Sequence, residues 1–267
     1  MVFLYDTIRI TICDGAFLVV FIFIWYFCID LRGGIRKGDH NMKNNKKEFC
    51  KGIGFLIGFA VWTIMIQITD VKPVGVNGTC IGFASVNVWF HSLTGVHMTI
   101  YTITDWLGLV PIMICLIFGI VGLTQLVKRK SIFKVDKDIV LLGFYYVTVI
   151  FAYLIFEMIP INYRPILIGG FMEASYPSST TLLVLSVMPT LKFQINRRSN
   201  HPIFHKLITV FVVLFSAFMV IGRLLAGVHW CTDIIGSILL SAGLFYLYRF
   251  SVSFVEQKNS EHSQEVG

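Results

Sequence analysis

The sequence predicts an all-α protein, a polytopic bundle of about seven transmembrane helices, from three observations. Of its 267 residues, 56% are hydrophobic and 14% are charged, whereas soluble chains carry about 25% charged residues. Its apolar runs are long and continuous, unlike the short alternating segments of a β-barrel. Its basic residues gather in alternate loops between those runs, as expected of a protein that crosses a membrane repeatedly.

The expected spans are the long runs without Lys, Arg, Asp or Glu. They are residues 15–29, 52–69, 106–127, 139–156, 174–191, 207–222 and 234–248. A spanning helix needs about 20 residues, so the shorter runs must extend into their flanks. We interpret 15–29 as a retained N-terminal span, because no small-residue cleavage site follows it.

The loop charges set the expected orientation. With seven spans, 18 of the 22 lysines and arginines fall in loops 30–51, 128–138 and 192–206 and in the C-terminal tail. By the positive-inside rule these segments are cytoplasmic, which puts the N-terminus outside and the C-terminus inside. Residues 81–104 also lack formal charge, but an eighth span there would carry Lys128, Arg129 and Lys130 across the membrane. We therefore expect 81–104 to lie at the outer surface or to re-enter without crossing.

The domain organisation that follows is simple. Residues 1–51 form the N-terminal span and a basic cytoplasmic loop, 52–250 one membrane domain, and 251–267 a polar cytoplasmic tail. The basic loops are expected to contact anionic lipid headgroups, and no nucleic-acid partner is needed to explain the net charge of +7. The six cysteines show no CxxC or Cys/His spacing, so no metal site is predicted.

The first candidate site lies between the last two runs. Arg223, His229 and Asp233 follow one another with intervals of six and four residues. If the chain is helical from 228, His229 and Asp233 share a face, where a carboxylate can hold one imidazole nitrogen protonated and leave the other reactive. Arg223 would supply donors for phosphate oxygens. The alternative is a structural Arg223–Asp233 pair with His229 merely packed beside it.

The second candidate site is built around the start of run 174–191. Arg164 and Tyr163 precede it, and Pro177 is followed by the hydroxyl residues Ser178, Ser179 and Thr180. Proline favours the first turn of a helix, whose free N–H groups bind anions. The alternative is an ordinary N-cap with additional hydroxyls. By the expected topology, Arg164, Ser178, Arg223 and His229 all fall on the outer side.

Together these residues resemble the three-part signature of the type-2 phosphatidic acid phosphatase superfamily, K-x6-R-P, P-S-G-H and S-R-x5-H-x3-D. The matching residues are Arg164-Pro165, Pro177-Ser178 and Arg223-x5-His229-x3-Asp233, within helices from about 106 to 250. Residues 70–84 are also similar to Gram-positive membrane members. The resemblance implies a six-helix phosphatase core, here with one extra N-terminal span.

The resemblance also implies roles. His229 would be the nucleophile that forms a phosphohistidine, and Asp233 would orient its ring. Arg164 and Arg223 would clamp the phosphoryl oxygens, while Ser178, Ser179, Thr180 and Tyr163 would help to bind substrate. No metal or cofactor takes part in that mechanism, in which positioning and charge neutralisation supply the catalysis.

The first and second motifs are degenerate. Glu157 stands where the family has lysine, Thr180 replaces the general-acid histidine, Ser179 replaces the preceding glycine, and Gly222 replaces a serine. Either the enzyme is impaired, or its substrate needs less acid assistance, or a carboxyl group has taken over that role. Glu157 is expected to pair with Arg164 or Arg223, to stay protonated as a substitute acid, or simply to face the headgroups.

Three functions are compared on this basis. The leading one is an outer-face phosphatase of a lipid phosphate or diphosphate, with isoprenyl diphosphate favoured because its leaving group needs no proton. The second is a catalytically impaired family member that binds lipid phosphate or a protein partner, which the missing lysine and histidine favour. A transporter is disfavoured, because the sequence shows no inverted repeat and no charges at mid-membrane depth.

Overall fold

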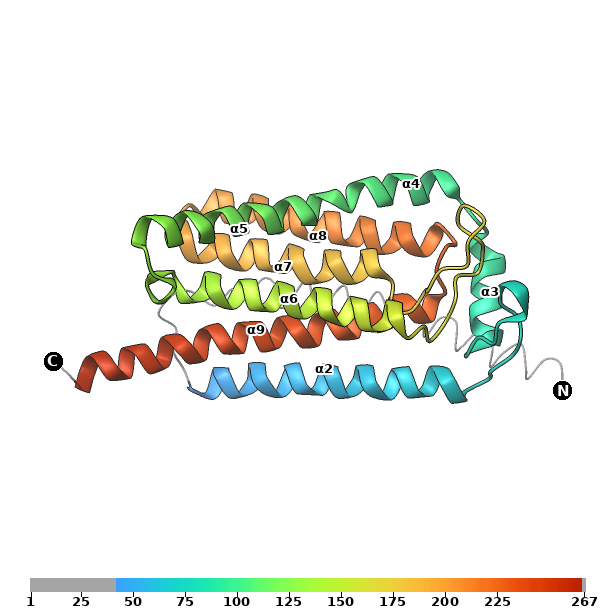
Figure 1. The fold of residues 1–267 in the computed structure, drawn as a ribbon, viewed down its shortest axis with the longest axis horizontal. Helices are drawn as coiled ribbons and strands as arrows, with labels where there is room; N and C mark the ends of the chain where they lie inside the picture. Colours follow the sequence, from blue (N-terminus) through green and yellow to red (C-terminus); the bar gives the residue numbers. More distant parts are fainter. Residues whose placement is uncertain (1–41, 266–267) are drawn as a thin grey trace.

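The computed structural model describes residues 42–265, and this part of the chain is a bundle of long helices (Figure 1). The expected span 15–29 lies outside the described residues. The helices are α2 (Met42–Ile68), α3 (Ala84–Thr94), α4 (Met98–Leu107), α5 (Leu109–Arg129), α6 (Lys137–Met158), α7 (Ser179–Arg198), α8 (Pro202–Leu225) and α9 (Cys231–Glu265). The all-α prediction is confirmed.

Five stretches of the described chain are long and apolar enough to cross a membrane. They are Asn45–Ile68, Met98–Arg129, Lys137–Met158, Pro202–Leu225 and Cys231–Glu261. Four expected runs lie within these stretches, and the run 52–69 ends one residue beyond the first. α7 is not among them, because it carries buried polar side chains such as Thr190, Lys192 and Gln194.

α7 nevertheless runs inside the bundle, with α8 on one side and α6 and α9 on the other (Figure 1). Most of its side chains are buried against these neighbours. The helix begins at Ser179, whereas the sequence suggested a span from 174. Pro177 disfavours helical geometry at Tyr176, and it precedes the N-cap residue Ser178, so its expected place in the first turn of the helix is wrong.

Residues 81–104 divide between two structures. α3 crosses the end of the bundle, whereas α4 runs along α8 and continues into α5 (Figure 1). The expectation of a segment that does not cross suits α3, whereas α4 belongs to the stretch Met98–Arg129, which is long and apolar enough to span a membrane. Asp105 marked the start of the expected span, but it lies within the long helix, where its side chain is exposed and its Oδ1 lies 3.6 Å from Arg223 Nη1.

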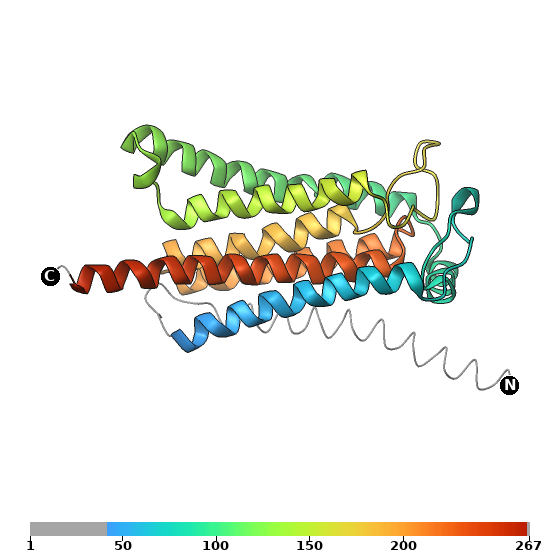
Figure 2. The same cartoon turned by 60° about the horizontal axis from the view of Figure 1, so that its bottom comes forward.

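α9 is the central helix of the bundle, with α2 on one side and α6 on the other (Figure 2). The α2–α3, α6–α7 and α8–α9 connections meet at one end of the bundle. The basic α5–α6 and α7–α8 connections lie at the opposite end (Figure 1). The two candidate sites of the sequence analysis thus lie together at the end of the bundle opposite the basic loops.

Candidate active site

The loop between α6 and α7 folds back on itself and carries the first group of site residues. The Arg164 N–H donates to the Glu173 carbonyl at 3.1 Å, and the Ser175 N–H donates to the Asn162 carbonyl at 2.9 Å. Tyr163 and Ala174 form an isolated antiparallel bridge between these bonds. This pairing of residues 162–164 with residues 173–175, called the ribbon below, fixes Arg164, Glu173 and Ser175 at the end of the bundle.

The loop between α8 and α9 carries His229, and its shape depends on Gly227. This glycine has a φ of 69°, and a Cβ placed on it would lie 2.0 Å from the Gly95 carbonyl oxygen. His91 of α3 holds the same loop, since its Nε2 lies 3.1 Å from the Gly227 carbonyl oxygen. Only glycine fits this close approach with a positive φ, so the position of His229 depends on it.

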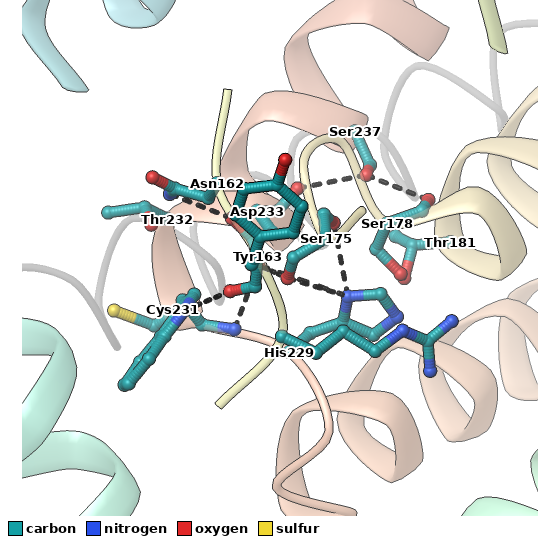
Figure 3. A network of polar contacts seen from close by, with 12 residues as sticks. Asn162, Tyr163, Ser175, Ser178, Thr181, His229, Cys231, Thr232, Asp233 and Ser237 are labelled. Atoms are coloured by element: carbon teal, nitrogen blue, oxygen red, sulfur yellow. Dashed lines mark hydrogen bonds and ion pairs between the residues drawn. The ribbon is translucent and has the colours of Figure 1, made fainter. Parts of the chain in front are cut away.

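The His229 ring is held through one nitrogen. Its Nδ1 lies 3.1 Å from the Ser175 carbonyl oxygen and 3.3 Å from the Ser175 hydroxyl (Figure 3). A carbonyl oxygen only accepts, so this geometry assigns the proton to Nδ1 and leaves a lone pair on Nε2. Nε2 is buried and has no hydrogen-bond partner among the described residues.

Asp233 does not contact His229 in the expected way. Its Oδ2 lies 3.9 Å from His229 Nδ1, beyond hydrogen-bonding distance. The Ser175 hydroxyl donates to this carboxylate and so lies between the two residues (Figure 3). The carboxylate also accepts from the Trp230 N–H at 2.9 Å and from Asn162 Nδ2 at 3.3 Å. Asp233 therefore joins α9 to both loops and reaches the histidine through Ser175.

Each site arginine has a carboxylate neighbour that the sequence analysis did not identify. Arg164 Nη2 lies 3.1 Å from Glu173 Oε2, and Arg223 Nη1 lies 3.6 Å from Asp105 Oδ1. Both guanidinium groups also lie over the Tyr101 ring, at 6.0 Å for Arg164 and 5.0 Å for Arg223. These contacts come from α4 and from the segment of the ribbon that contains Glu173, so no residue spacing in the sequence predicts them.

A polar pocket of about 230 Å³ opens between α6, the ribbon and the His229 loop. Its lining includes Glu157, Arg164, Glu173, Tyr176, Ser179 and His229. Arg223 lies deeper, only 1% exposed, and its charge acts on both Arg164 and His229. The structure thus brings together the predicted arginines and the predicted histidine.

Three of the residues expected to bind substrate do not line this pocket. The hydroxyl of Ser178 donates to Thr181 Oγ1 at 3.1 Å, and its carbonyl accepts from Ser237 at 3.0 Å (Figure 3). Thr180 is buried, and its methyl group faces Gly108, 3.7 Å from where a Cβ added to that glycine would lie. Tyr163 contributes its carbonyl oxygen to Trp230 Nε1 at 2.8 Å. Successive residues of a helical turn point in different directions, which leaves Ser179 at the pocket.

Glu157 lies at the pocket but does not form the expected ion pair. Its side chain is exposed near the end of α6. In residues 42–265, Arg164 pairs with Glu173 and Arg223 with Asp105, and neither pairs with Glu157. Its polar neighbour is the Tyr153 hydroxyl. The remaining interpretations, an acid or a headgroup-facing residue, stay open.

The electrostatics of the pocket favour a neutral histidine and an anionic ligand. Burial, followed by the charges of Arg164 and Arg223, holds the pKa of His229 well below its ordinary value of 6.5. Arg164 Nε and Nη1 and Arg223 Nε are buried without a hydrogen-bond partner among the described residues. Buried donors are nearly always satisfied in native structures, so these atoms point to a ligand that accepts hydrogen bonds. No cluster of three or more potential metal ligands occurs among residues 42–265.

A family profile described as the PAP2 superfamily matches residues 141–255, which include most of α6, the ribbon, α7, α8, the His229 loop and most of α9. Over these residues the chain matches the superfamily of type-2 phosphatidic acid phosphatases. The resemblance to this superfamily is therefore confirmed, and the match together with the apolar helices supports a multi-pass membrane protein related to lipid phosphatases.

The fold agrees with this membership. The chain resembles the crystal structure of a transmembrane PAP2-type phosphatidylglycerolphosphate phosphatase from Bacillus subtilis with a TM-score of 0.54. The two sequences are 17% identical, and the match covers 74% of this chain and 94% of the other. At this identity the likeness shows a common fold. No protein of curated function matches the chain.

Proposed function

We propose that the protein is an integral membrane phosphatase that removes phosphate from a lipid phosphate or diphosphate through a phosphohistidine at His229. One observation carries the proposal: the buried nitrogens His229 Nε2, Arg164 Nε and Nη1, and Arg223 Nε lack partners in the described chain. Leaving such groups unsatisfied costs about 1–3 kcal/mol each. A phosphoryl group suits these groups chemically, because it offers an electrophilic phosphorus to the imidazole and anionic oxygens to the guanidinium groups.

The proposed reaction begins with attack by the His229 Nε2 lone pair on phosphorus. The bond from phosphorus to the lipid-side oxygen breaks, and its electron pair leaves with that oxygen. Arg164 and Arg223 neutralise the phosphoryl oxygens as charge develops. The Ser175 carbonyl accepts the Nδ1 proton at 3.1 Å, which keeps the reactive tautomer in place. Water then releases phosphate from Nε2.

We further propose that diphosphates, such as an isoprenyl diphosphate, are preferred to monoesters. A monoester must release an alkoxide, whose conjugate acid has a pKa near that of water, about 15.7. A lipid diphosphate releases a phosphate monoester whose second pKa is about 6, and this group leaves without a proton. Thr180 supplies no acid, and its side chain does not line the pocket. The lack of an acid at position 180 supports the preference for diphosphates.

The outer face of the membrane is the proposed site of the reaction. The pocket is at the end of the bundle opposite the basic α5–α6 and α7–α8 connections (Figure 1). Basic loops are retained in the cytoplasm by the positive-inside rule, which leaves the pocket end outside. A phosphorylated lipid of the outer leaflet would then present its headgroup to Arg164 and His229.

The test is phosphate release from a panel of matched lipid monophosphates and diphosphates by purified protein in detergent. The proposal predicts release by the unmodified protein, faster on the diphosphates, and none above background with His229→Ala. Equal rates on matched mono- and diphosphates, with chemistry shown to limit the rate, would contradict the preference alone.

A second candidate is a catalytically impaired member that binds lipid phosphate. It is favoured by the loss of the family's lysine at Glu157 and of its histidine at Thr180. In that case the unmodified protein would bind the diphosphate lipids, Arg164→Ala would abolish the binding, and no phosphate would be released from any lipid of the panel.

A further inference from the structure

Glu173 lines the pocket of the proposed nucleophile and is not used in the reaction described above. It lines the same pocket as His229, and its Oε2 lies 3.1 Å from Arg164 Nη2. Its backbone carbonyl accepts from the Arg164 N–H at 3.1 Å, so the ribbon fixes the two residues side by side. The Glu173 side chain is 39% exposed and that of Arg164 is 10% exposed. The carboxylate therefore stands on the side of Arg164 that water reaches.

The second half of the proposed reaction lacks a proton acceptor. A water molecule that attacks a phosphohistidine must lose a proton, and a positioned base accelerates such a step by about 10²–10⁴-fold. The Thr180 hydroxyl is a poor base and does not line the pocket. His229 itself is the leaving group of this step. Asp233 is fully buried and already accepts from Ser175, Trp230 and Asn162.

We propose that Glu173 is the general base that hydrolyses the phosphohistidine, an inference that rests on the proposed function. Water oxygen forms a bond to phosphorus while the Glu173 carboxylate takes one of the water protons. The bond from phosphorus to Nε2 breaks, and its electron pair returns to the His229 ring. The departing phosphate then removes the proton from Glu173, which restores the carboxylate for the next cycle.

The surroundings of Glu173 suit this role. The ion pair with Arg164 holds the Glu173 carboxylate in place at the pocket. When a phosphoryl group takes the free nitrogens of Arg164, the carboxylate remains next to the bound phosphorus centre. Glu157 and Tyr153 of α6 also line the pocket, and Glu157 is the one other carboxylate in its lining. Glu157 has no ion pair to either site arginine, so it is the matched control.

The experiment compares Glu173→Gln with Glu157→Gln by rapid quench, with farnesyl diphosphate in detergent as the probe. Dephosphorylated lipid, free phosphate and protein-bound phosphate are measured in the same samples. For Glu173→Gln we expect a burst of lipid product approaching one equivalent, accumulated phosphoenzyme, and steady phosphate release lowered about 10²-fold or more. Added formate, a small carboxylate, should restore part of the release. For Glu157→Gln no phosphoenzyme should accumulate.

The outcomes separate a base from a structural residue. A merely structural Glu173 would slow both half-reactions without accumulated phosphoenzyme, and that result overturns the inference. Accumulation in Glu157→Gln in place of Glu173→Gln also overturns it. Absence of phosphate release and of phosphoenzyme from the unmodified protein contradicts the proposed function itself, and so remains distinguishable from failure of this inference alone.

Discussion

His229 and Asp233 are coupled through Ser175, since their side chains lie 3.9 Å apart and the serine hydroxyl bonds to the carboxylate. A direct His–Asp pair was the expectation from their spacing of four residues. The cause of the difference is the position of His229 in the loop before α9, which begins only at Cys231. The two residues therefore do not share a helical face.

The bridging serine gives the first prediction. Ser175→Ala removes the hydroxyl between the ring and the carboxylate but keeps the backbone carbonyl that binds Nδ1. A hydrogen bond to a charged group contributes about 1.5–3 kcal/mol, so we expect kcat to fall about 10- to 100-fold. Ser237→Ala is the matched control, because within residues 42–265 its hydroxyl bonds to the Ser178 and Asp233 carbonyls and not to the Asp233 carboxylate. Equal kcat values for the two variants would argue against the bridge.

The loop that presents His229 gives the second prediction. Gly227→Ala forces a side chain into a conformation with φ of 69° and into the Gly95 carbonyl. The left-handed conformation alone costs about 1–2 kcal/mol. We expect a lower Tm and loss of phosphate release. Gly119→Ala in α5 is the control, because nothing lies within 4 Å of its added Cβ. If Gly227→Ala keeps both the Tm and the activity, the loop does not depend on this glycine.

The buried histidine gives a prediction for stability against pH. Its pKa in the folded state lies below its ordinary value of 6.5. As the pH falls below that value, the unfolded state takes up a proton that the folded state does not. The free energy of unfolding therefore falls, by up to about 1.4 kcal/mol for each pH unit, until the folded-state pKa is reached.

The measurement is Tm from pH 7.5 to pH 5.5 for the unmodified protein and for His229→Gln. The unmodified protein should lose more Tm over this interval, because glutamine has no proton to take up. Parallel curves for the two proteins would mean that the folded and unfolded pKa values of His229 coincide.

Two native cysteines test the orientation of the bundle. Cys80 is exposed in the α2–α3 connection at the pocket end, and Cys50 is exposed near the start of α2 at the opposite end. A membrane-impermeant maleimide applied to intact cells should label Cys80 and spare Cys50, as peptide mapping would show. After the cells are permeabilised, both should react. Labelling of Cys50 alone in intact cells would reverse the proposed orientation.

The sequence predicted the parts of the structure that depend on local pattern. Apolar runs located α5, α6, α8 and α9, and the spacing of Arg223 and His229 pointed to the loop between α8 and α9 as a candidate site. Ser175, Glu173 and Asp105 were missed because they meet the site through backbone pairing of the ribbon and through packing of α4 on α8. Such contacts join residues far apart in the chain, and no periodicity encodes them.

The three consecutive hydroxyl residues at 178–180 show the same limit of prediction from local sequence pattern. Ser178, Ser179 and Thr180 are consecutive, so they could not all face one pocket once α7 began at Ser179. The sequence predicted a helix near Pro177, but neither its first residue, Ser179, nor the direction of each side chain. That direction is set by the packing of α7 against α9 and α5.

The central claim is that His229 carries the phosphoryl group during turnover. The most direct measurement is rapid quench in alkali with a lipid diphosphate labelled in the terminal phosphate, followed by peptide mapping of the protein-bound label. The account predicts label on His229 that is stable to alkali and lost in acid, and none in His229→Ala. Label on another residue, or undiminished phosphate release by His229→Ala, would contradict it.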